Sequence, residues 1–240
     1  MIPFLASAAQ GHELRYALRS WAENFQDCHI IIIGDKPDFI SDEVIHIPAA
    51  VSHKSPQLDV THKIIQAIAS DLVTDEFILT NDDIYLANFI ELAEIAELKC
   101  SGTLGFTKKK APQGYQEKLQ RAISQLRDAK RPIHDYATHT PFLFNKEKMA
   151  KVIARYNCDT VPSLISCLYY NSVFPKLQPT QIKGDKTGDY VAYVYRADPD
   201  LALLRSAFES RKIVNHNKHG YAAVLPLLQE YFPDKCKFEI

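Results

Sequence analysis

Residues 77–88 read FILTNDDIYLAN, and this stretch decides how the rest of the chain is interpreted. Its first four residues suit a buried strand, and Asn81, Asp82 and Asp83 follow at once. Two adjacent carboxylates repel each other, and burial of either is costly unless a positive charge lies beside it. No Lys or Arg lies within ten residues of the pair on either side. Either both acids point into water, or a cation that is not part of the chain completes the site.

Strand-like and helix-like segments alternate before the acid pair. In chain order, these segments are 2–6, 14–25, 29–33, 44–47, 59–72 and 76–80. After the pair, we expect strands at 103–106 and 189–196 and a helix that Asn145 caps and that runs to Tyr156. The alternation predicts an α/β fold with a mainly parallel, doubly wound central sheet flanked by helices. Ligands of such sheets bind beyond the carboxyl ends of the strands, which is where the acid pair is expected.

Length and composition limit the class of protein. A chain of 240 residues with 46% hydrophobic residues suits one domain with a substantial core. The 28 basic and 29 acidic residues show no overall bias toward nucleic acid or an anionic membrane. No GxGxxG or Walker loop is present, which disfavours a Rossmann dehydrogenase or a P-loop NTPase.

Localisation is predicted from what the sequence lacks. The longest aliphatic run, Ile30–Ile33, is too short to cross a bilayer, and the N-terminus lacks the charged start of a signal peptide. The five cysteines are odd in number and form no CxxC pair, so neither a disulfide framework nor a zinc knuckle is indicated. We therefore expect a reduced, cytoplasmic protein.

One segment differs in character from its surroundings. Residues 108–131 are basic and polar, and we expect a helix after Gly114. A solvated arm and a lid facing the acceptor both fit this composition, and the lysine run at its start is more often a solvated loop than a binding site.

Adjacent acids at a strand exit suit a hard divalent cation with oxygen ligands, such as Mg²⁺ or Mn²⁺. One role for such an ion is to bridge the diphosphate of a nucleotide sugar and to neutralise the charge that develops as the sugar bond breaks. Asn81 could orient one of the carboxylates. Asn-Asp-Asp is also ordinary turn composition, so a solvated turn explains the same residues.

Four stretches follow one another along the chain: ELRYALRSW (13–21), NDD (81–83), HTP (139–141) and LQEYFPDKCKFE (228–239). In this order they resemble the motifs of the Stealth family, whose members are sugar-phosphate transferases of bacterial capsule synthesis. The resemblance implies a GT-A-like fold, a nucleotide-sugar donor with uridine as the expected base, and a metal held by Asp82 and Asp83. It also implies one domain over 1–240, in which 1–106 binds the donor and 107–240 faces the acceptor.

The chain departs from the family pattern at three places. FLASAAQGH stands where the family opens with VYTWVDGSD, Asp59 and Ile64 replace a usual Asn and Glu, and Asn215-His216 replaces Asn-Asp. These changes leave the reaction open between glycosyl transfer to a glycan or other hydroxyl acceptor and sugar-1-phosphate transfer of the Stealth type. A nucleotide- or glycan-binding module without turnover is the alternative from another class.

His139 resembles the histidine of the family's HxP motif. An imidazole titrates near neutrality, so His139 suits a general base that removes the proton of an acceptor hydroxyl. We take His139 and Asp83 as the catalytic residues. A hydrogen-bonded histidine at a strand end is the structural alternative for His139.

Two residues near the C-terminus are further ligand candidates. GT-A-like enzymes often complete the metal shell from a C-terminal loop, so His216 is a candidate metal ligand and Asn215 a candidate ligand of metal or phosphate. The alternative for both is a polar loop that opens a helix at Gly220.

Three arginines are candidate phosphate ligands. Arg15 and Arg19 are four residues apart and could present two guanidinium groups to a phosphate. The alternative is that both are solvated while their apolar neighbours pack. Arg155 has the same two interpretations.

Three further residues are candidate donor contacts. Asp59 and Lys63 lie one helical turn apart, so Lys63 could reach a diphosphate; the alternative is a surface ion pair that contributes little. Asp35 follows a predicted strand and could bind a ribose or a base, or it could belong to an ordinary Gly-Asp turn.

Overall fold

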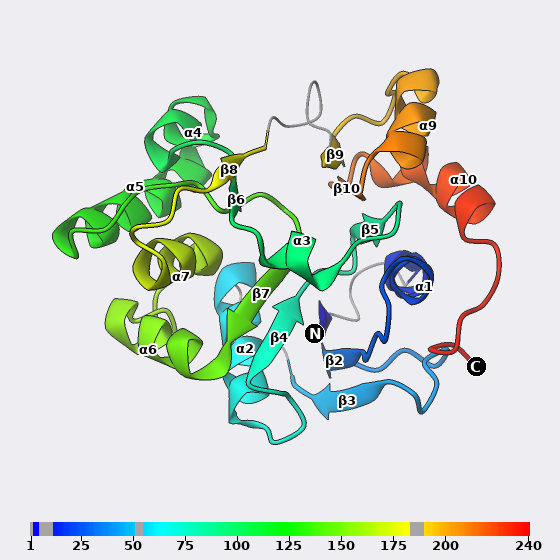
Figure 1. Cartoon of the computed structure of the whole chain (residues 1–240), viewed down its shortest axis with the longest axis horizontal. Helices are drawn as coiled ribbons and strands as arrows, with labels where there is room; N and C mark the ends of the chain where they lie inside the picture. The colour runs from blue at the N-terminus through cyan, green and yellow to red at the C-terminus, as the bar shows by residue number, and fades with distance from the viewer. Residues whose placement is uncertain (1, 5–11, 51–54, 183–189) are drawn as a thin grey trace.

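The computed structural model describes residues 2–4, 12–50, 55–182 and 190–240, and it shows a mixed α/β fold with short strands (Figure 1). In chain order the elements are β1 (Ile2–Phe4), α1 (His12–Asn24), β2 (Ile31–Gly34), β3 (Ile45–Pro48), α2 (Pro56–Ala69), β4 (Glu76–Leu79), β5 (Ile84–Leu86), α3 (Leu92–Ala96), β6 (Lys99–Cys100), α4 (Leu104–Lys110), α5 (Gln113–Asp128), β7 (Phe142–Asn145), α6 (Lys146–Tyr156), α7 (Ile165–Val173), β8 (Thr180–Gln181), β9 (Val191–Val194), α9 (Leu201–Ser210), β10 (Ile213–His216) and α10 (Tyr221–Tyr231).

The first three strands form the parallel sheet that the sequence predicts. They pair in the order β1-β2-β3, with Ile32 of β2 opposite Ile2 of β1 and His46 of β3. Ile32 and Ile33 are fully buried, because a β-branched run in a central parallel strand packs on both faces. The alternation of helix and strand therefore predicted this part of the fold correctly.

Beyond β3, the described strands form three small separate sheets instead of continuing one parallel sheet, although two of their pairings, β9 with β10 and β6 with β8, are parallel. Among the described residues, β4 pairs antiparallel with β7, β10 pairs antiparallel with β5 and parallel with β9, and β6 pairs with β8. Parallel neighbours need a crossover that returns the chain in the same direction. The short turn at 81–83 leads directly into β5 instead, and β7 arrives beside β4 from the opposite direction (Figure 1).

Two helix starts show how local chemistry decides the elements. Asn145 caps α6, as predicted, and its side-chain oxygen accepts a hydrogen bond from the Lys148 amide at 3.1 Å. The strand predicted at 103–106 is wrong, because Thr103 instead caps α4 and accepts from the Phe106 amide. A Thr before an apolar residue fits both a strand and a helix start, so periodicity could not separate them here.

The basic segment is a pair of helices on the body of the protein. α5 buries Leu119, Ala122, Ile123 and Leu126 at helical spacing, and its polar residues face outward. The helix after Gly114 is therefore confirmed, and the packed apolar face shows that this segment is not a detached arm.

Buried residues form three apolar clusters, and one of them contains α1, β2 and β5 together with Phe238 near the C-terminus. All five cysteines are free thiols, and Cys236 is the only one that is not fully buried. Among the described helices, none combines the length and the apolar character needed to cross a bilayer.

Candidate functional site

The acid pair lies in the turn between β4 and β5, at the carboxyl end of β4. The turn is closed by the Ile84 amide, which donates to the Asn81 carbonyl at 3.4 Å. Asp83 reaches across to His139, whose Nε2 lies 3.0 Å from Asp83 Oδ2. Two stretches 56 residues apart, NDD and HTP, therefore meet at one place.

His139 has an uncommon backbone conformation. Its φ angle is +54°, in the left-handed region where a residue with a side chain is strained. The Asn215 side-chain amide donates to the His139 carbonyl and holds this conformation. Asn215 lies opposite Ile84 of β5 and beside Tyr193 of β9, so β10 positions Asn215 next to the acid pair.

The electrostatics of the site are unusual. Burial, together with the charges of Asp83 and Glu13, raises the pKa of Asp82 to about 7. Burial also raises the pKa of Glu13, with a contribution from Asp83. Within the described chain, the imidazole of His139 is the one basic group whose charge acts on Asp82 against these effects. The charges of Glu13, Asp82 and Asp83 therefore repel one another, and the imidazole of His139 partly offsets this repulsion.

The pKa of His139 is shifted by opposing effects. Burial alone would lower it, but the hydrogen bond to Asp83 and the charges of Asp83 and Asp82 outweigh burial and raise it. Because Nε2 faces a carboxylate, Nε2 carries the donated hydrogen. Nδ1 is then the nitrogen left to accept a proton when the ring is neutral.

Two buried oxygens bear on whether a metal ion fits the site around Asp83. Asp83 Oδ1 and Asn215 Oδ1 are both buried, and neither has a hydrogen-bond partner among the described residues. Buried polar atoms without partners are costly, so these oxygens are suited to a ligand that binds them. Carboxylate and amide oxygens are the donors that Mg²⁺ and Mn²⁺ prefer, and the residues therefore fit a hard cation.

The described residues contain no group of three or more His, Cys, Asp or Glu side chains that could hold a metal ion by themselves. This is compatible with Mg²⁺, which usually takes one or two carboxylates and completes its octahedral shell with substrate phosphates and water. Asp82 and Asp83, with Asn215 beside them, are the residues that would hold the ion.

His216 does not offer a free nitrogen to this site. Its Nδ1 lies 3.0 Å from the Asn217 carbonyl, so Nδ1 must donate, and its Nε2 accepts from the Tyr85 hydroxyl at 2.8 Å. The residue is also 1% exposed, and burial lowers its pKa. The predicted metal ligand would have to give up the Tyr85 bond to bind a cation.

The two N-terminal arginines lie in a different contact from the one predicted. Arg15 Nη1 lies 2.8 Å from Glu239 Oε1, and Arg19 Nε lies 2.7 Å from Glu239 Oε2. Arg19 also donates to the carbonyls of Phe232 and Pro233. This ion-pair cluster, which we call the C-terminal clamp, ties α1 to the end of the chain. Because both guanidinium groups already bind Glu239, we assign Arg15 and Arg19 a structural role, and the prediction that they bind phosphate is corrected.

The predicted donor contacts Asp59, Lys63, Asp35 and Arg155 are not brought into the cluster around His139. Asp59 and Lys63 form an ion pair at 2.7 Å within α2, and because both are almost fully buried, it is not the surface pair considered as the alternative. Asp35 is exposed after β2. Arg155 is exposed in the last turn of α6, with its guanidinium 5.7 Å from the Tyr156 ring.

Sequence reasoning missed two residues of the site. Glu13 begins the ELRYALRSW stretch, but only the two arginines of that stretch were predicted to bind a ligand. Tyr193 was seen only as part of a strand, but its ring centroid lies 5.7 Å from that of His139. An acid in the first turn of α1 was a usable signal for Glu13, whereas no local pattern marks Tyr193.

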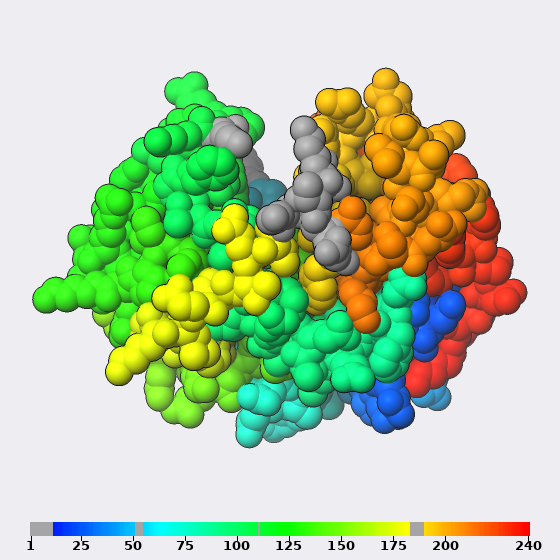
Figure 2. All heavy atoms as spheres, turned by 45° about the horizontal axis from the view of Figure 1, so that its top comes forward, coloured from blue at the N-terminus to red at the C-terminus, as the bar shows by residue number. Residues whose placement is uncertain are grey.

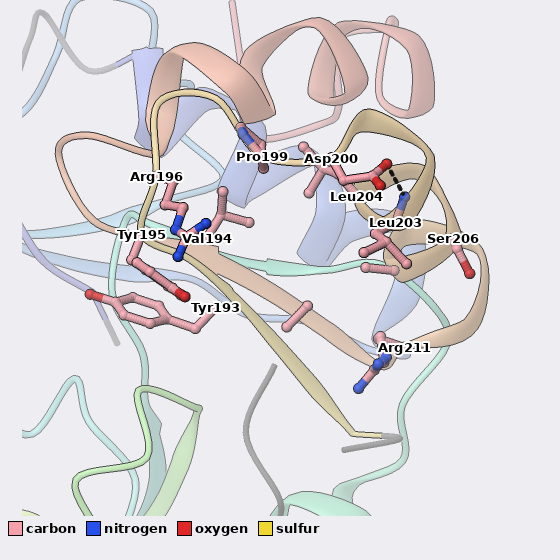
Figure 3. A pocket seen from close by; sticks show the side chains of 12 residues that line it. Tyr193, Val194, Tyr195, Arg196, Pro199, Asp200, Leu203, Leu204, Ser206 and Arg211 are labelled. Carbon is pink, nitrogen blue, oxygen red and sulfur yellow. Dashed lines mark hydrogen bonds between the residues drawn. The ribbon is translucent and has the colours of Figure 1, made fainter. Parts of the chain in front are cut away.

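A cavity of about 340 Å³ opens beside His139. Ser101, Thr138, Tyr193 and Tyr195 are among the residues that line it. Figure 2 shows a notch on this side of the molecule between α4 and α9. A larger cavity, of about 530 Å³, lies between β9 and α9, and none of the predicted site residues lines it (Figure 3). Because the chemistry gathers around His139, the smaller cavity is the candidate site.

No protein-family model matches the chain, and no curated protein matches it either. The resemblance to the Stealth family therefore stays a prediction, and the function has to be proposed from the residues and their geometry.

Proposed function

We propose that the chain is a metal-dependent transferase that uses a nucleotide-sugar donor and transfers the sugar to a glycan or another hydroxyl-bearing acceptor. One observation carries the proposal. Asp83 accepts a hydrogen bond from His139 through Oδ2. Its Oδ1 and the Oδ1 of Asn215 are buried and have no hydrogen-bond partner among the described residues. A single carboxylate can thereby orient a base and contribute to cation binding at the same time.

The division of work between the residues follows from this geometry. Asp83 Oδ2 fixes the tautomer of His139, so that Nδ1 can accept the proton of the attacking hydroxyl. Asn215 holds the His139 backbone, and the cavity beside the ring offers space for the acceptor. A bound Mg²⁺ or Mn²⁺ would act as a Lewis acid and neutralise charge on the donor diphosphate.

The same residues fit sugar-1-phosphate transfer of the Stealth type, in which the hydroxyl attacks the β-phosphorus instead of the anomeric carbon. The products separate the two reactions. With a uridine sugar, glycosyl transfer releases UDP, and sugar-phosphate transfer releases UMP.

The first experiment is a thermal-shift screen of nucleotide sugars with and without Mn²⁺, followed by analysis of the released nucleotide. We expect stabilisation by a donor that depends on the metal, and loss of that dependence in Asp82→Ala and Asp83→Ala. Asp71→Ala is the matched control, because Asp71 is an exposed acid outside the site. His139→Gln should keep donor binding and lose turnover, because the base acts on the acceptor.

Different outcomes contradict different parts of the proposal. Normal turnover in both Asp variants would remove the metal assignment. Full activity in His139→Gln would remove only the base. Metal-dependent donor binding without any product from a range of acceptors would instead favour a binding module without turnover.

A further inference from the structure

A second cavity, which His139 does not line, occupies a cleft between β9 and α9 (Figure 3). Its volume of about 530 Å³ is in the range of small-molecule sites. Ala192 and Val194 form its floor from β9, and Leu203 and Leu204 form its wall from α9. Tyr193 and Tyr195 line both this cleft and the cavity beside His139, and Figure 3 shows their rings directed away from α9.

Arg211 gives the cleft an unbalanced positive charge. Its backbone is fixed, because its amide donates to Ala207 and its carbonyl accepts from the Asn88 side chain at 2.6 Å. Its guanidinium lines the cleft, yet Nη1 is buried without a hydrogen-bond partner in the described part of the chain. A buried guanidinium nitrogen without an acceptor is costly unless a ligand supplies one.

The other charged groups of the cleft do not neutralise Arg211. Arg196 lies at the opposite end in Figure 3, with its guanidinium 5.4 Å from the Tyr195 ring. Asp200 already accepts hydrogen bonds from the amides of Ala202 and Leu203, as the N-cap of α9. Within the described residues, no carboxylate forms an ion pair with either arginine of the cleft.

Apolar side chains form part of the cleft that is open to water, beside the polar Ser206 and Asp200. Leu203 is 70% exposed although it faces a cavity that also contains the buried Leu204 and Val194. An apolar ligand body would remove this surface from water, which favours binding. The cleft therefore combines a site for one anionic group with a site for an apolar body.

We propose that the cleft between β9 and α9 binds an amphiphilic anion, a small molecule that carries a phosphate or carboxylate group on an apolar chain or ring. Arg211 holds the anionic group by charge-assisted hydrogen bonds, and Leu203, Leu204 and Val194 cover the apolar body. This inference does not rest on the proposed transfer reaction, because the ligand is tested by binding alone.

The test is isothermal titration calorimetry on the full chain without metal or nucleotide. The probes are octyl phosphate and octanoate, with octanol as the neutral control and inorganic phosphate as the control without an apolar body. At least one anionic amphiphile should bind about ten-fold or more tightly than octanol and than inorganic phosphate, because charged hydrogen bonds and apolar contact add. The tighter of the two anions identifies the head group.

Matched variants locate the binding. Arg211→Gln should weaken the bound amphiphile roughly 10- to 100-fold, whereas Arg205→Gln should not, because Arg205 is exposed and pairs with Glu230. Leu203→Ser should weaken it about five-fold, and Leu201→Ser, an equally exposed change outside the cleft, should leave it unchanged. The exposed Leu203 keeps the test decisive if Arg211→Gln does not fold.

Three results would overturn the proposal. The first is that neither amphiphile binds at millimolar concentration. The second is that octanol binds as tightly as the anions, which would make the charge irrelevant. The third is that each cleft variant and its control lose the same affinity, which would place the binding elsewhere.

Discussion

The C-terminal clamp makes a prediction about stability that can be worked out from its contacts. Glu239 accepts four hydrogen bonds: one from Arg15, two from Arg19 and one from the Cys236 amide, over 2.7–3.2 Å. Its side chain is 0% exposed, and that of Arg19 is 10% exposed. The change Glu239→Gln keeps the shape and removes the charge, which leaves two arginines without their counter-ion.

Breaking one side of a buried ion pair destabilises a protein by about 3–5 kcal/mol. Since the glutamine side chain would keep an amide oxygen, we expect a loss of about 3 kcal/mol, which lowers the midpoint of thermal unfolding by roughly 6–12 °C for a chain of this size. Urea unfolding at pH 7, followed by circular dichroism, measures the free energy directly. The control is Glu230→Gln, because Glu230 pairs with Arg205 on the surface and should contribute almost nothing.

The same contacts set the pH dependence of this difference. Burial alone would raise the pKa of Glu239, but the hydrogen bonds from Arg19 and Cys236 and the charges of Arg19 and Arg15 lower it below 4.5. A carboxyl whose pKa is lower in the folded state stabilises the fold above its unfolded pKa and loses that effect as the pH falls through the folded pKa. Wild type and Glu239→Gln should therefore converge in acid. Equal losses for Glu239→Gln and Glu230→Gln at pH 7 would refute the clamp.

Three other changes test the site and its surroundings by urea unfolding. Asp82→Asn should stabilise the protein by up to about 4 kcal/mol at pH 8 in a chelating buffer, because the pKa of the acid is raised from 3.8 to about 7. Burial raises the pKa of Asp82 to about 7, so ionisation of this acid destabilises the fold as the pH rises from about 4 to 7. The stability that the variant gains should therefore vanish near pH 4, and a gain that persists there would contradict this explanation. Asn215→Ala should cost about 1–3 kcal/mol, since it removes the hydrogen bond to the partly buried His139 carbonyl, and an unchanged free energy would exclude that role. Gly220→Ala should cost about 3 kcal/mol or more, because a Cβ there would lie 2.1 Å from the Val194 carbonyl oxygen. The control is Gly114→Ala, whose Cβ would meet no atom within 4 Å, so that this change should stabilise α5 by up to about 1 kcal/mol.

The prediction of local elements succeeded where the pattern is carried by neighbours in the sequence. Asn145 was predicted as a helix cap, and the β-branched segment at 29–33 was predicted as a strand, because both depend on residues that are close in the sequence. Strand pairing could not be predicted in the same way. Whether β4 takes β7 as an antiparallel neighbour depends on contacts between residues that are more than 60 positions apart.

The candidate site shows the same limit. The sequence indicated that Asp83 and His139 matter, but the hydrogen bond between them and the unpartnered oxygens of Asp83 and Asn215 within the described chain appear only after β5 and β10 pair. The two N-terminal arginines illustrate the opposite error. Their spacing fits a phosphate, and spacing alone does not show that a buried glutamate from the other end of the chain already binds them.

By itself, the sequence determined the class of fold, the helix cap at Asn145 and the acid pair at a strand exit, because propensity, capping and charge repulsion act between near neighbours. Only the tertiary structure decided which charged groups meet. Electrostatic and hydrogen-bond energies depend on distance and burial, and the folded chain alone sets these for residues as remote as Arg19 and Glu239 or Asp83 and His139.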